Sequence, residues 1–438
     1  MQAPGPHLLQ FLNGVRTLGF LDFVGKQWRE HGDVFQVRIG RRTLVFAMHP
    51  DVVERVSVSH RQNYEKLGSY DSVRKYLIGN GIVASNGELW RRQRKLMAPF
   101  YTPKGVQAYA ELMIRDGARL VERWEALASK GTEVEIAEEM TNVTASIILK
   151  AMFSTETMES IHQMKDAVET MLSFVNDQMA GPTLPMWLPT SKNRKYLAAR
   201  EMVHRSIRAL IAERRGTDEA QWHDDLLSRL MKARDDETGQ AMSESLLRDE
   251  SITTFFAGHE TTARTMTFAW YALATNPKVT ERLHEELDRV LGGRTPTANE
   301  LRQLPYTLQV IKEVLRLYPA APFYARDVVT ADKFGDFDVA YLHREQLLAA
   351  RKPPAPRDAR AAVHAAIARR LRAALVDAGH ARHHERAADG DHAALKSAAH
   401  ARVLPSRRHG CRNALAHRLV STSLVGLRHP PRAQRAKA

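Results

Sequence analysis

An acid, two hydroxyls and a glycine occur close together in the stretch TTFFAGHETTARTM, residues 253–266. The surrounding apolar pattern is not interrupted by proline before Pro277, which predicts one continuous helix over about residues 246–275. Side chains three or four residues apart share one face of a helix. The spacing therefore predicts a face made of Ala257, Glu260, Thr261 and Arg264.

Two features of this stretch favour a cavity in the middle of the helix. Gly258 lacks a side chain, at a cost of about 1 kcal/mol relative to alanine, and the gap lets a flat or bulky group approach the backbone. A threonine hydroxyl can bond a carbonyl of the preceding turn and bend the helix locally. The motif predicts a cavity lined by an acid and a hydroxyl, although a buried helix with a polar seam explains the same residues.

Two further pairs could bind or organise charge. Glu313 and Arg316 stand three residues apart in VIKEVLRLYPAAPFYARDV, and their apolar flanks predict a semi-buried ion pair rather than an ordinary surface pair. Trp90 and Arg94 lie four residues apart in NGELWRRQRKLMAPFYTP and would offer an indole N–H and a guanidinium to an anion. A basic surface helix is the alternative explanation of that second stretch.

The elements that must position these residues are mostly helical. Residues 33–49 predict a β-hairpin around residues 40–42, and short extended pieces return after Pro322. The helical patterns begin near Glu88 and continue over residues 105–129, 136–152, 158–179, 195–215, 224–235, 244–275, 277–291 and 307–318. The prediction is a mainly α protein with a small β portion.

Taken in order, these motifs resemble those of the cytochrome P450 family, the haem-thiolate monooxygenases, over about residues 1–338. The distal helix motif of that family matches residues 257–262, AGHETT. Its Glu-x-x-Arg matches Glu313 and Arg316, and its Trp-x-x-x-Arg matches Trp90 and Arg94. Its later arginine, which binds a haem propionate, matches Arg326.

The resemblance implies haem as cofactor, with a cysteine thiolate as the ligand that favours O–O cleavage. It implies that Thr261 hydrogen-bonds bound oxygen and that Glu260 relays protons to it. Ala257 and Gly258 would give room for haem and substrate. Trp90, Arg94 and Arg326 would bind propionates, and Glu313 and Arg316 would be structural.

The substrate and the electron donor are only broadly indicated. The substrate loops of the family would fall near Ser69–Asn86 and Phe174–Pro189, whose Met, Phe, Leu and Trp content suggests an apolar small molecule such as a fatty acid, terpenoid or steroid. Core packing explains the same residues. Because the chain shows no flavin or ferredoxin domain, electrons are expected from a separate ferredoxin or flavoprotein reductase.

The pattern of the family stops before its cysteine loop, Phe-x-x-Gly-x-Arg-x-Cys-x-Gly. The only cysteine is Cys411, and the four other motif positions hold Leu404, Arg407, His409 and Asn413. Cys411 is thus a poor match to the expected iron ligand. The sequence therefore predicts a P450 fold truncated before that loop, and it leaves open a catalytically inactive remnant that lacks the thiolate.

A sharp break in composition begins near residue 339. Residues 341–438 hold 20 of the 64 Lys and Arg but only 6 of the 50 Asp and Glu, so they account for the whole net charge of +14. They also hold 10 of the 19 histidines, and Tyr341 is their only aromatic residue. We interpret residues 339–438 as a poorly packed Ala/Arg/His-rich tail that arose from a frameshift near Val339, which codon choice permits.

Nucleic-acid binding is the alternative role for this basic tail, but interleaved aromatic residues and zinc-finger spacing are missing, so we do not favour it. A single cysteine excludes an intramolecular disulfide, and the N-terminal residues contain neither a 20-residue apolar span nor a signal-peptide core. The sequence therefore predicts a soluble, cytoplasmic protein.

Overall fold

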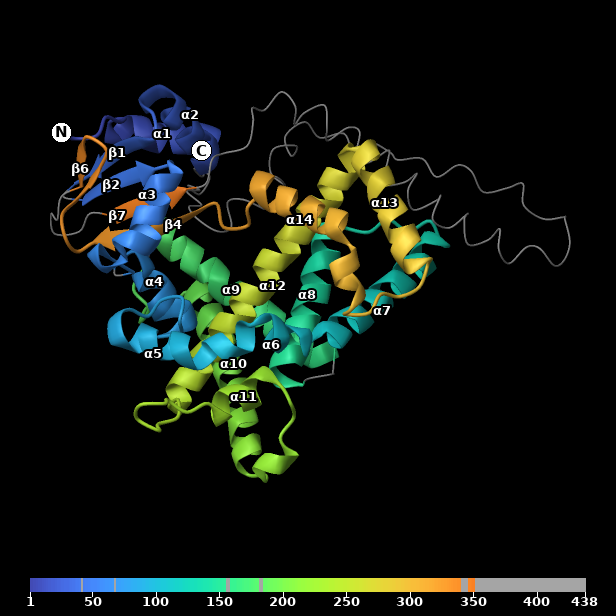
Figure 1. The fold of residues 1–438 in the computed structure, drawn as a ribbon. Coiled ribbons are helices and arrows are strands. Elements are labelled where there is room, and N and C mark those ends of the chain that lie inside the picture. Colours follow the sequence, from blue (N-terminus) through green and yellow to red (C-terminus); the bar gives the residue numbers. More distant parts are fainter. Residues whose placement is uncertain (41, 67, 155–157, 181–183, 340–345, 351–438) are drawn as a thin grey trace, which may run out of the picture.

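The computed structural model describes residues 1–339 and 346–350, apart from residues 41, 67, 155–157 and 181–183 (Figure 1). Helices predominate in this part of the chain, and the strands are few and short. This confirms the predicted fold class. The elements form a small sheet with helices on it and a larger helical part, which the 32-residue helix α12 (Glu244–Thr275) crosses.

Five strands form the larger sheet, in the order β1-β2-β7-β4-β3. The predicted hairpin is confirmed as β1 (Val34–Ile39) and β2 (Arg42–Ala47), which pair antiparallel. Strand β7 (Gln346–Ala350) runs parallel to β2 and antiparallel to β4 (Phe323–Val328). Strand β3 (Tyr64–Glu65) closes the order, and β5 (Asp332–Phe334) and β6 (Phe337–Val339) form a separate hairpin.

The position of β7 bears on the predicted boundary at residues 338/339. The backbone of residues 346–350 belongs to the sheet, although the sequence assigned these residues to the tail. A strand needs only backbone groups to join a ladder, so the composition of the segment gave no sign of this pairing. Residues 340–345 and 351–438 of the predicted tail lie outside the described residues.

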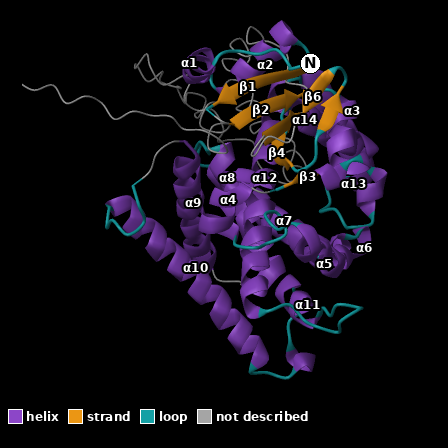
Figure 2. Cartoon of the chain, turned by 90° about the vertical axis from the view of Figure 1, so that its left-hand side faces the viewer, coloured by secondary structure: helices purple, strands orange, loops and turns teal. Residues whose placement is uncertain are grey.

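Two helices that the sequence reasoning did not predict cover the sheet, α1 (Leu8–Leu18) and α2 (Phe20–His31). Figures 1 and 2 both show them beside β1. Phe11 of α1 and Phe23 of α2 meet edge to face at 5.6 Å, and Phe35 stacks on Phe46 across the hairpin at 4.7 Å. Buried aromatic rings therefore fix the helices on the sheet.

The helical part has its own core, in which α8 (Ile136–Phe153), α9 (Met158–Ala180) and α10 (Ser191–Arg215) pack with α12. A buried ion pair joins this core to α11 (Leu226–Lys232), because Arg214 donates to both carboxylate oxygens of Asp225 at 2.8 and 3.0 Å. The helices α13 (Pro277–Leu291) and α14 (Pro305–Leu317) follow α12.

The remaining α-helices are short except for two. They are α3 (Pro50–Glu54), α4 (Asp71–Val73), α5 (Gly87–Met97), α6 (Pro103–Gln107) and α7 (Ala110–Ala128). The sequence predicted one helix over residues 105–129, but the structure divides it into α6 and α7. Gly105 sits against the carbonyl groups of Pro99 and Phe100, so the first piece is held against the preceding turn.

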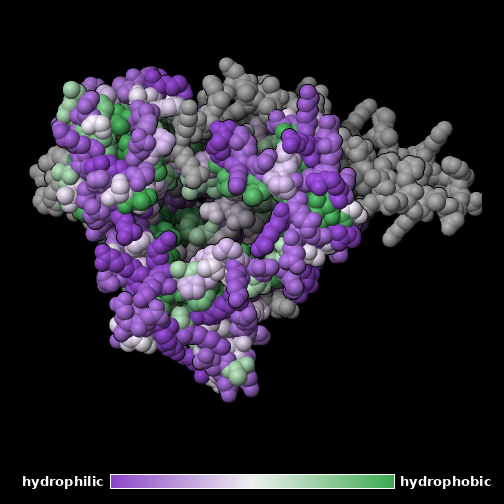
Figure 3. Space-filling model, viewed as in Figure 1, coloured by the Kyte–Doolittle hydropathy of each residue, from purple (hydrophilic) through white to green (hydrophobic). Residues whose placement is uncertain are grey.

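The space-filling view shows a recess between the sheet-bearing part and the helical part, with apolar residues on its floor (Figure 3). Helix α12 passes along this region, as Figure 1 shows. Among the described helices, none combines the length and the apolar character that a membrane span requires. The recess is the hollow of this face that lies near α12, the helix that carries the AGHETT motif (Figures 1 and 3).

Candidate cofactor and oxygen site

Helix α12 presents two different faces at the AGHETT motif. The side chain of Ser243 caps its first turn by accepting from the backbone N–H of Leu246 at 3.2 Å. Ala257 and Thr261 are exposed, whereas His259, between them in sequence, is 2% exposed. The predicted face is therefore open, and the opposite face packs into the core.

His259 belongs to that buried face. Its ring stacks on Phe255 at 4.7 Å, and its Nδ1 lies 3.1 Å from the carbonyl oxygen of Phe255. Burial lowers the pKa of the imidazole. The sequence assigned His259 no role at the site, and in the structure it is a core residue.

The hydroxyl of Thr261 is used within the helix. It donates to the carbonyl oxygen of Ala257 at 2.6 Å, as expected for a threonine that bonds the preceding turn. The carbonyl of Thr261 in turn accepts from the hydroxyl of Thr265 at 2.9 Å. The Thr261 side chain is exposed, so its acceptor lone pairs remain open.

Glu260 forms an ion pair with Arg264, which lies one turn further along the same helix. Arg264 donates to the carboxylate of Glu260; the Glu260 side chain is 21% exposed and the Arg264 side chain 11%. This places Glu260 and Arg264 on one face, as the spacing predicted. The carboxylate is fixed beside Thr261 but not removed from solvent.

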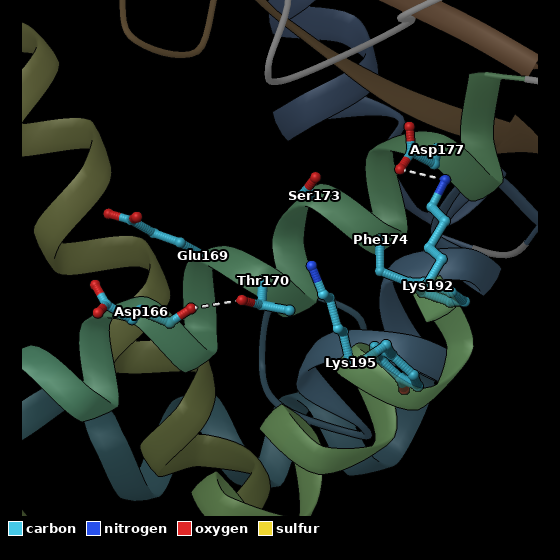
Figure 4. A pocket seen from close by; sticks show the side chains of 9 residues that line it. Asp166, Glu169, Thr170, Ser173, Phe174, Asp177, Lys192 and Lys195 are labelled. Carbon is cyan, nitrogen blue, oxygen red and sulfur yellow. Dashed lines mark hydrogen bonds and ion pairs between the residues drawn. The ribbon is translucent and has the colours of Figure 1, made fainter. Parts of the chain in front are cut away.

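A second carboxylate, Glu169 of α9, lies near Glu260. Burial raises the pKa of Glu169, and the like charges of Asp166 and Glu260 raise it further, while Lys165 opposes them. Figure 4 shows the Glu169 carboxylate extended towards α12. The sequence reasoning missed Glu169, because only the approach of α9 to α12 gives it a neighbour in the motif.

A cavity of about 460 Å³ lies over this surface of α9 and α10. Figure 4 shows Lys192 and Lys195 reaching towards it from α10, and Lys192 pairs with Asp177. Both polar and apolar surface lines it, from Asp166, Glu169, Thr170, Ser173, Phe174, Asp177, Lys192, Lys195 and Tyr196. The cavity thus overlaps the start of the predicted substrate loop at residues 174–189.

Gly258 packs against a neighbouring helix and does not open the cavity that the sequence predicted. A side-chain carbon at this position would come within 3.0 and 3.1 Å of Cδ1 and Cγ1 of Ile148 in α8. The space left by the missing side chain is therefore taken by a neighbouring helix. Gly258 permits close packing of α12 on α8, whereas Ala257 is the small residue on the open face.

The predicted cationic residues lie on different elements. Trp90 and Arg94 are both on α5, where the guanidinium carbon of Arg94 is 5.7 Å from the Trp90 ring centroid. Among the described residues, neither Arg94 nor Arg326 of β4 forms an ion pair with a carboxylate, and the indole N–H of Trp90 has no acceptor. These donors are available to an anion.

Lys66 joins this group, and the sequence reasoning missed it. Its ammonium lies 5.6 Å from the Trp90 ring centroid and donates to the carbonyl oxygen of Ile82 at 2.9 Å. The pKa of Lys66 is lowered to about 8, mainly by burial and also by the positive charges of Arg326 and Arg74. A lone lysine in the sequence gives no such signal, because the cluster exists only where β3, β4 and α5 meet.

The pair of Glu313 and Arg316 forms as predicted, but it is not semi-buried. Arg316 donates to both carboxylate oxygens at 2.7 and 2.8 Å, and this hydrogen bonding lowers the pKa of Glu313. The two side chains are 54% and 67% exposed. The interpretation from apolar flanks was wrong because, of the residues of α14, only Val314 is buried, on the opposite face of the helix.

The described residues fit two parts of a flat, doubly anionic cofactor. Unpaired cationic groups at Lys66, Arg94 and Arg326 suit carboxylates, and the exposed face at Ala257 and Thr261 leaves the backbone accessible to a planar group. The cysteine that would bind the iron is not among the described residues. Cys411, the only cysteine, lies outside the described residues.

Comparison with known proteins agrees with this geometry. The family model described as "Cytochrome P450" matches residues 3–341. The solved structure of the cytochrome P450DA heme domain superposes with a TM-score of 0.71 at 24% identity, covering 80% of this chain and 78% of that one, which shows the shared fold.

Curated relatives give the same result. Cyclooctatin synthase of Streptomyces melanosporofaciens is 33% identical over 70% of this chain and 66% of its own length. Cyclooctat-9-en-7-ol 5-monooxygenase of the same organism is 35% identical over 66% of this chain and 62% of its own. The matched region thus spans about two thirds or less of the length of these relatives.

The mainly helical fold, with its acid–threonine pair on the long helix α12, is the fold that the solved structure shares. The chain belongs to the cytochrome P450 family. That family implies haem as the cofactor.

Proposed function

We propose that this chain carries the oxygen-binding and propionate-binding parts of a haem-dependent monooxygenase that hydroxylates an apolar small molecule. The open face of α12, with Glu260 fixed beside Thr261, is the observation that carries the proposal. Haem supplies the oxygen chemistry, in which one atom of O₂ enters a C–H bond and the other leaves as water, with two electrons and two protons consumed.

The residues of this chain would bind the cofactor and set its position. Lys66, Trp90, Arg94 and Arg326 would hold the two carboxylates of the cofactor. Ala257 would leave space above its plane, and Gly258 would set the distance of α12 from α8. These roles place the cofactor against the exposed face of α12.

Proton delivery would involve Glu260 and Thr261. Glu260 is ion-paired but 21% exposed, so it can exchange protons with solvent while Arg264 keeps it in position. Thr261 would give up its bond to the carbonyl of Ala257 and offer its hydroxyl hydrogen on the open face of α12. Glu313 and Arg316 would be structural, and the electrons would come from a separate ferredoxin or flavoprotein reductase.

The names of the relatives support an apolar substrate in broad terms. One relative is named as a 5-monooxygenase of cyclooctat-9-en-7-ol, and another, pentalenene oxygenase of Streptomyces avermitilis, is 31% identical over 68% of this chain. Both names denote the oxygenation of a small organic molecule. We propose a substrate of that kind, without a closer identity.

A catalytically inactive remnant is the second candidate function. The observation that favours it is the mismatch of every motif position around Cys411, at Leu404, Arg407, His409 and Asn413. A carbon-monoxide difference spectrum of the reduced, haem-reconstituted chain separates the two candidates. The red-shifted band of thiolate-ligated haem would support the monooxygenase, and its absence with haem bound would support the remnant.

A further inference from the structure

Side chains of other elements hold the backbone of the loop at residues 79–82. The N–H of Asn80 donates to Asp249 at 2.8 Å, and its carbonyl accepts from Nε2 of Gln93 at 2.7 Å. The N–H of Ile82 donates to Glu250 at 3.1 Å. The loop is thereby attached to α12 and to α5 through its own peptide groups.

The glycines of this loop allow α12 to come close. Gly79 has φ +56°, and a side-chain carbon there would collide with the carboxylate of Asp249. A side-chain carbon at Gly81 would collide with the hydroxyl of Thr253. The loop can therefore adjust very little against α12 without breaking these contacts.

Glu250 is the residue that connects α12 to both neighbours. It is fully buried, and its Oε1 accepts from Nε2 of Gln93 at 2.6 Å while its Oε2 accepts from the N–H of Ile82. Both partners are donors, so the geometry fits an ionised carboxylate. Gln93 is also fully buried and lies on α5 between Trp90 and Arg94.

A proton on Glu250 would disturb this arrangement. A carboxylic acid adds a donor that would face the N–H of Ile82 or the amide of Gln93. Within the described part of the chain, Oε1 of Gln93 is buried with no partner, so it is the available acceptor. The amide of Gln93 would have to turn over to present it, and its bond to the carbonyl of Asn80 would be lost.

The charges around Glu250 come from three elements. The pKa of Glu250 is raised to about 7: burial is the main cause and Asp249 of α12 adds to it, while the bonds from Ile82 and Gln93 and the charge of Lys66 oppose the increase. Tyr101 faces it from the turn after α5. Lys66 is bonded to the carbonyl of the same Ile82 whose N–H binds Glu250, so one peptide residue separates the two charges.

We propose that Glu250 is a positioning residue: its ionised form locks α5 and the loop 79–82 so that Lys66, Trp90 and Arg94 face the carboxylates of the cofactor, and its protonation loosens that lock. The inference rests on the proposed function, since it assumes that a doubly anionic planar cofactor binds there. It assigns a role to a buried acid that lies outside the AGHETT motif.

Porphyrin binding by the full chain tests the consequence for the site. The probes are protoporphyrin IX and its dimethyl ester, which has the same ring without free carboxylates, and quenching of tryptophan fluorescence reports binding. Between pH 6 and pH 8, the wild type should bind protoporphyrin IX more weakly as pH falls. Glu250→Gln should bind it about tenfold more weakly than the wild type at pH 8, as one lost buried hydrogen bond predicts. Its binding should not weaken further as pH falls, because Lys66, whose pKa is about 8, gains charge over the same interval.

The matched control is Glu244→Gln, on the first turn of the same helix, where Glu244 makes an exposed ion pair with Arg215. It should follow the wild type. A second variant, Gln93→Leu, removes a bond that lowers the pKa of Glu250, so it should move the pH at which Glu250 titrates upwards. The dimethyl ester should bind all four proteins alike.

Unfolding of the cofactor-free chain gives a readout that does not depend on porphyrin. The folded-state pKa of Glu250 is raised from its usual 4.5 to about 7, so its contribution to stability decreases as pH rises through this interval. Relative to Glu250→Gln, the folding equilibrium constant of the wild type should fall by about two orders of magnitude between pH 4.5 and pH 7.

The two readouts separate the possible failures. If the wild type does not prefer protoporphyrin IX over its ester, the proposed carboxylate site is wrong, whatever Glu250 does in unfolding. If the acid is preferred but Glu250→Gln binds it as the wild type does at every pH, the positioning role is overturned. Equal pH dependence of unfolding in Glu250→Gln and the wild type would also overturn it.

Discussion

The hydroxyl of Thr261 donates a 2.6 Å hydrogen bond to the carbonyl oxygen of Ala257, and both side chains are exposed on the same face of α12. A hydroxyl has one hydrogen to donate, so this bond uses the whole donor capacity of Thr261. Any donation to a bound ligand must therefore break it. The carbonyl of Ala257 would then turn to solvent or to another donor, which limits the cost of the exchange.

Replacing Thr261 by alanine should separate haem binding from oxygen chemistry. In a frame-restored, haem-loaded protein, Thr261→Ala should leave haem content nearly unchanged and raise several-fold the peroxide released per O₂ consumed, because the hydroxyl acts on bound oxygen and not on the fold. Peroxide and product are measured together. Thr267→Ala is the control, since Thr267 makes the same kind of bond, at 2.8 Å to Ala263, away from the motif. Unaltered coupling in Thr261→Ala would contradict the assigned role.

Replacing Gly258 tests whether this glycine serves packing against α8. Alanine gains about 1 kcal/mol of helix propensity over glycine, but its methyl group would press on Ile148 at 3.0–3.1 Å. Gly258→Ala should therefore stabilise the chain in an Ile148→Ala background by about 1 kcal/mol more than it does in the wild type. Urea unfolding of the four proteins of this double-mutant cycle measures the coupling. Additive effects would show that Ile148 does not oppose a side chain at this position.

The sequence pattern located the long helices well where one face is strongly apolar or a cap is clear. The bounds predicted for α12 and α13 agree with the structure at both ends, at residues 244–275 and 277–291. Ser243 begins one helix, and Pro277 stands at the start of the next. Short helices α1 and α2 were not predicted, because Gly14, Gly19 and Gly25 break their apolar residues into short clusters.

Which side chains lie together could be predicted only within one continuous motif. Ala257, Glu260 and Thr261 lie within five consecutive residues, and helix geometry alone puts them together. The pKa values of Lys66 and Glu250 are perturbed mainly by burial, and also by residues distant in the sequence, such as Arg326 for Lys66 and Ile82 and Gln93 for Glu250, so a single segment of sequence does not reveal them. The exposure of Glu313 was likewise decided by which face of α14 is covered, and periodicity does not fix that.

The contrast between two ion pairs gives a stability prediction. Arg316 and Glu313 are mostly exposed, whereas Arg214 and Asp225 are 5% and 2% exposed. Glu313→Gln should leave the melting temperature of this chain almost unchanged, because solvent replaces the lost partner. Asp225→Asn should destabilise it by about 3 kcal/mol, since a buried guanidinium loses its counter-charge. Thermal unfolding at low and high salt checks both, and a large effect of Glu313→Gln would show that the pair is covered in solution.

The last prediction concerns iron ligation and the reading frame. An iron–thiolate bond needs an ionised sulfur held near the haem and shielded by backbone N–H groups, which a glycine-rich loop supplies. Around Cys411 the motif glycines are replaced by Arg407 and Asn413, and Gly410 is the only glycine beside it. Arg408 and Arg412 can lower the pKa of a thiol, but charge alone does not create the loop. We expect the chain to give no thiolate-type spectrum with carbon monoxide, and we expect Cys411→Ser to bind haem as the wild type does. Resequencing the gene should reveal an insertion or deletion near codon 339, and restoring the frame should produce a cysteine loop of the P450 type together with the thiolate spectrum. A strong thiolate spectrum from the unrepaired chain, abolished by Cys411→Ser, would show that Cys411 is the ligand and that the frame is intact.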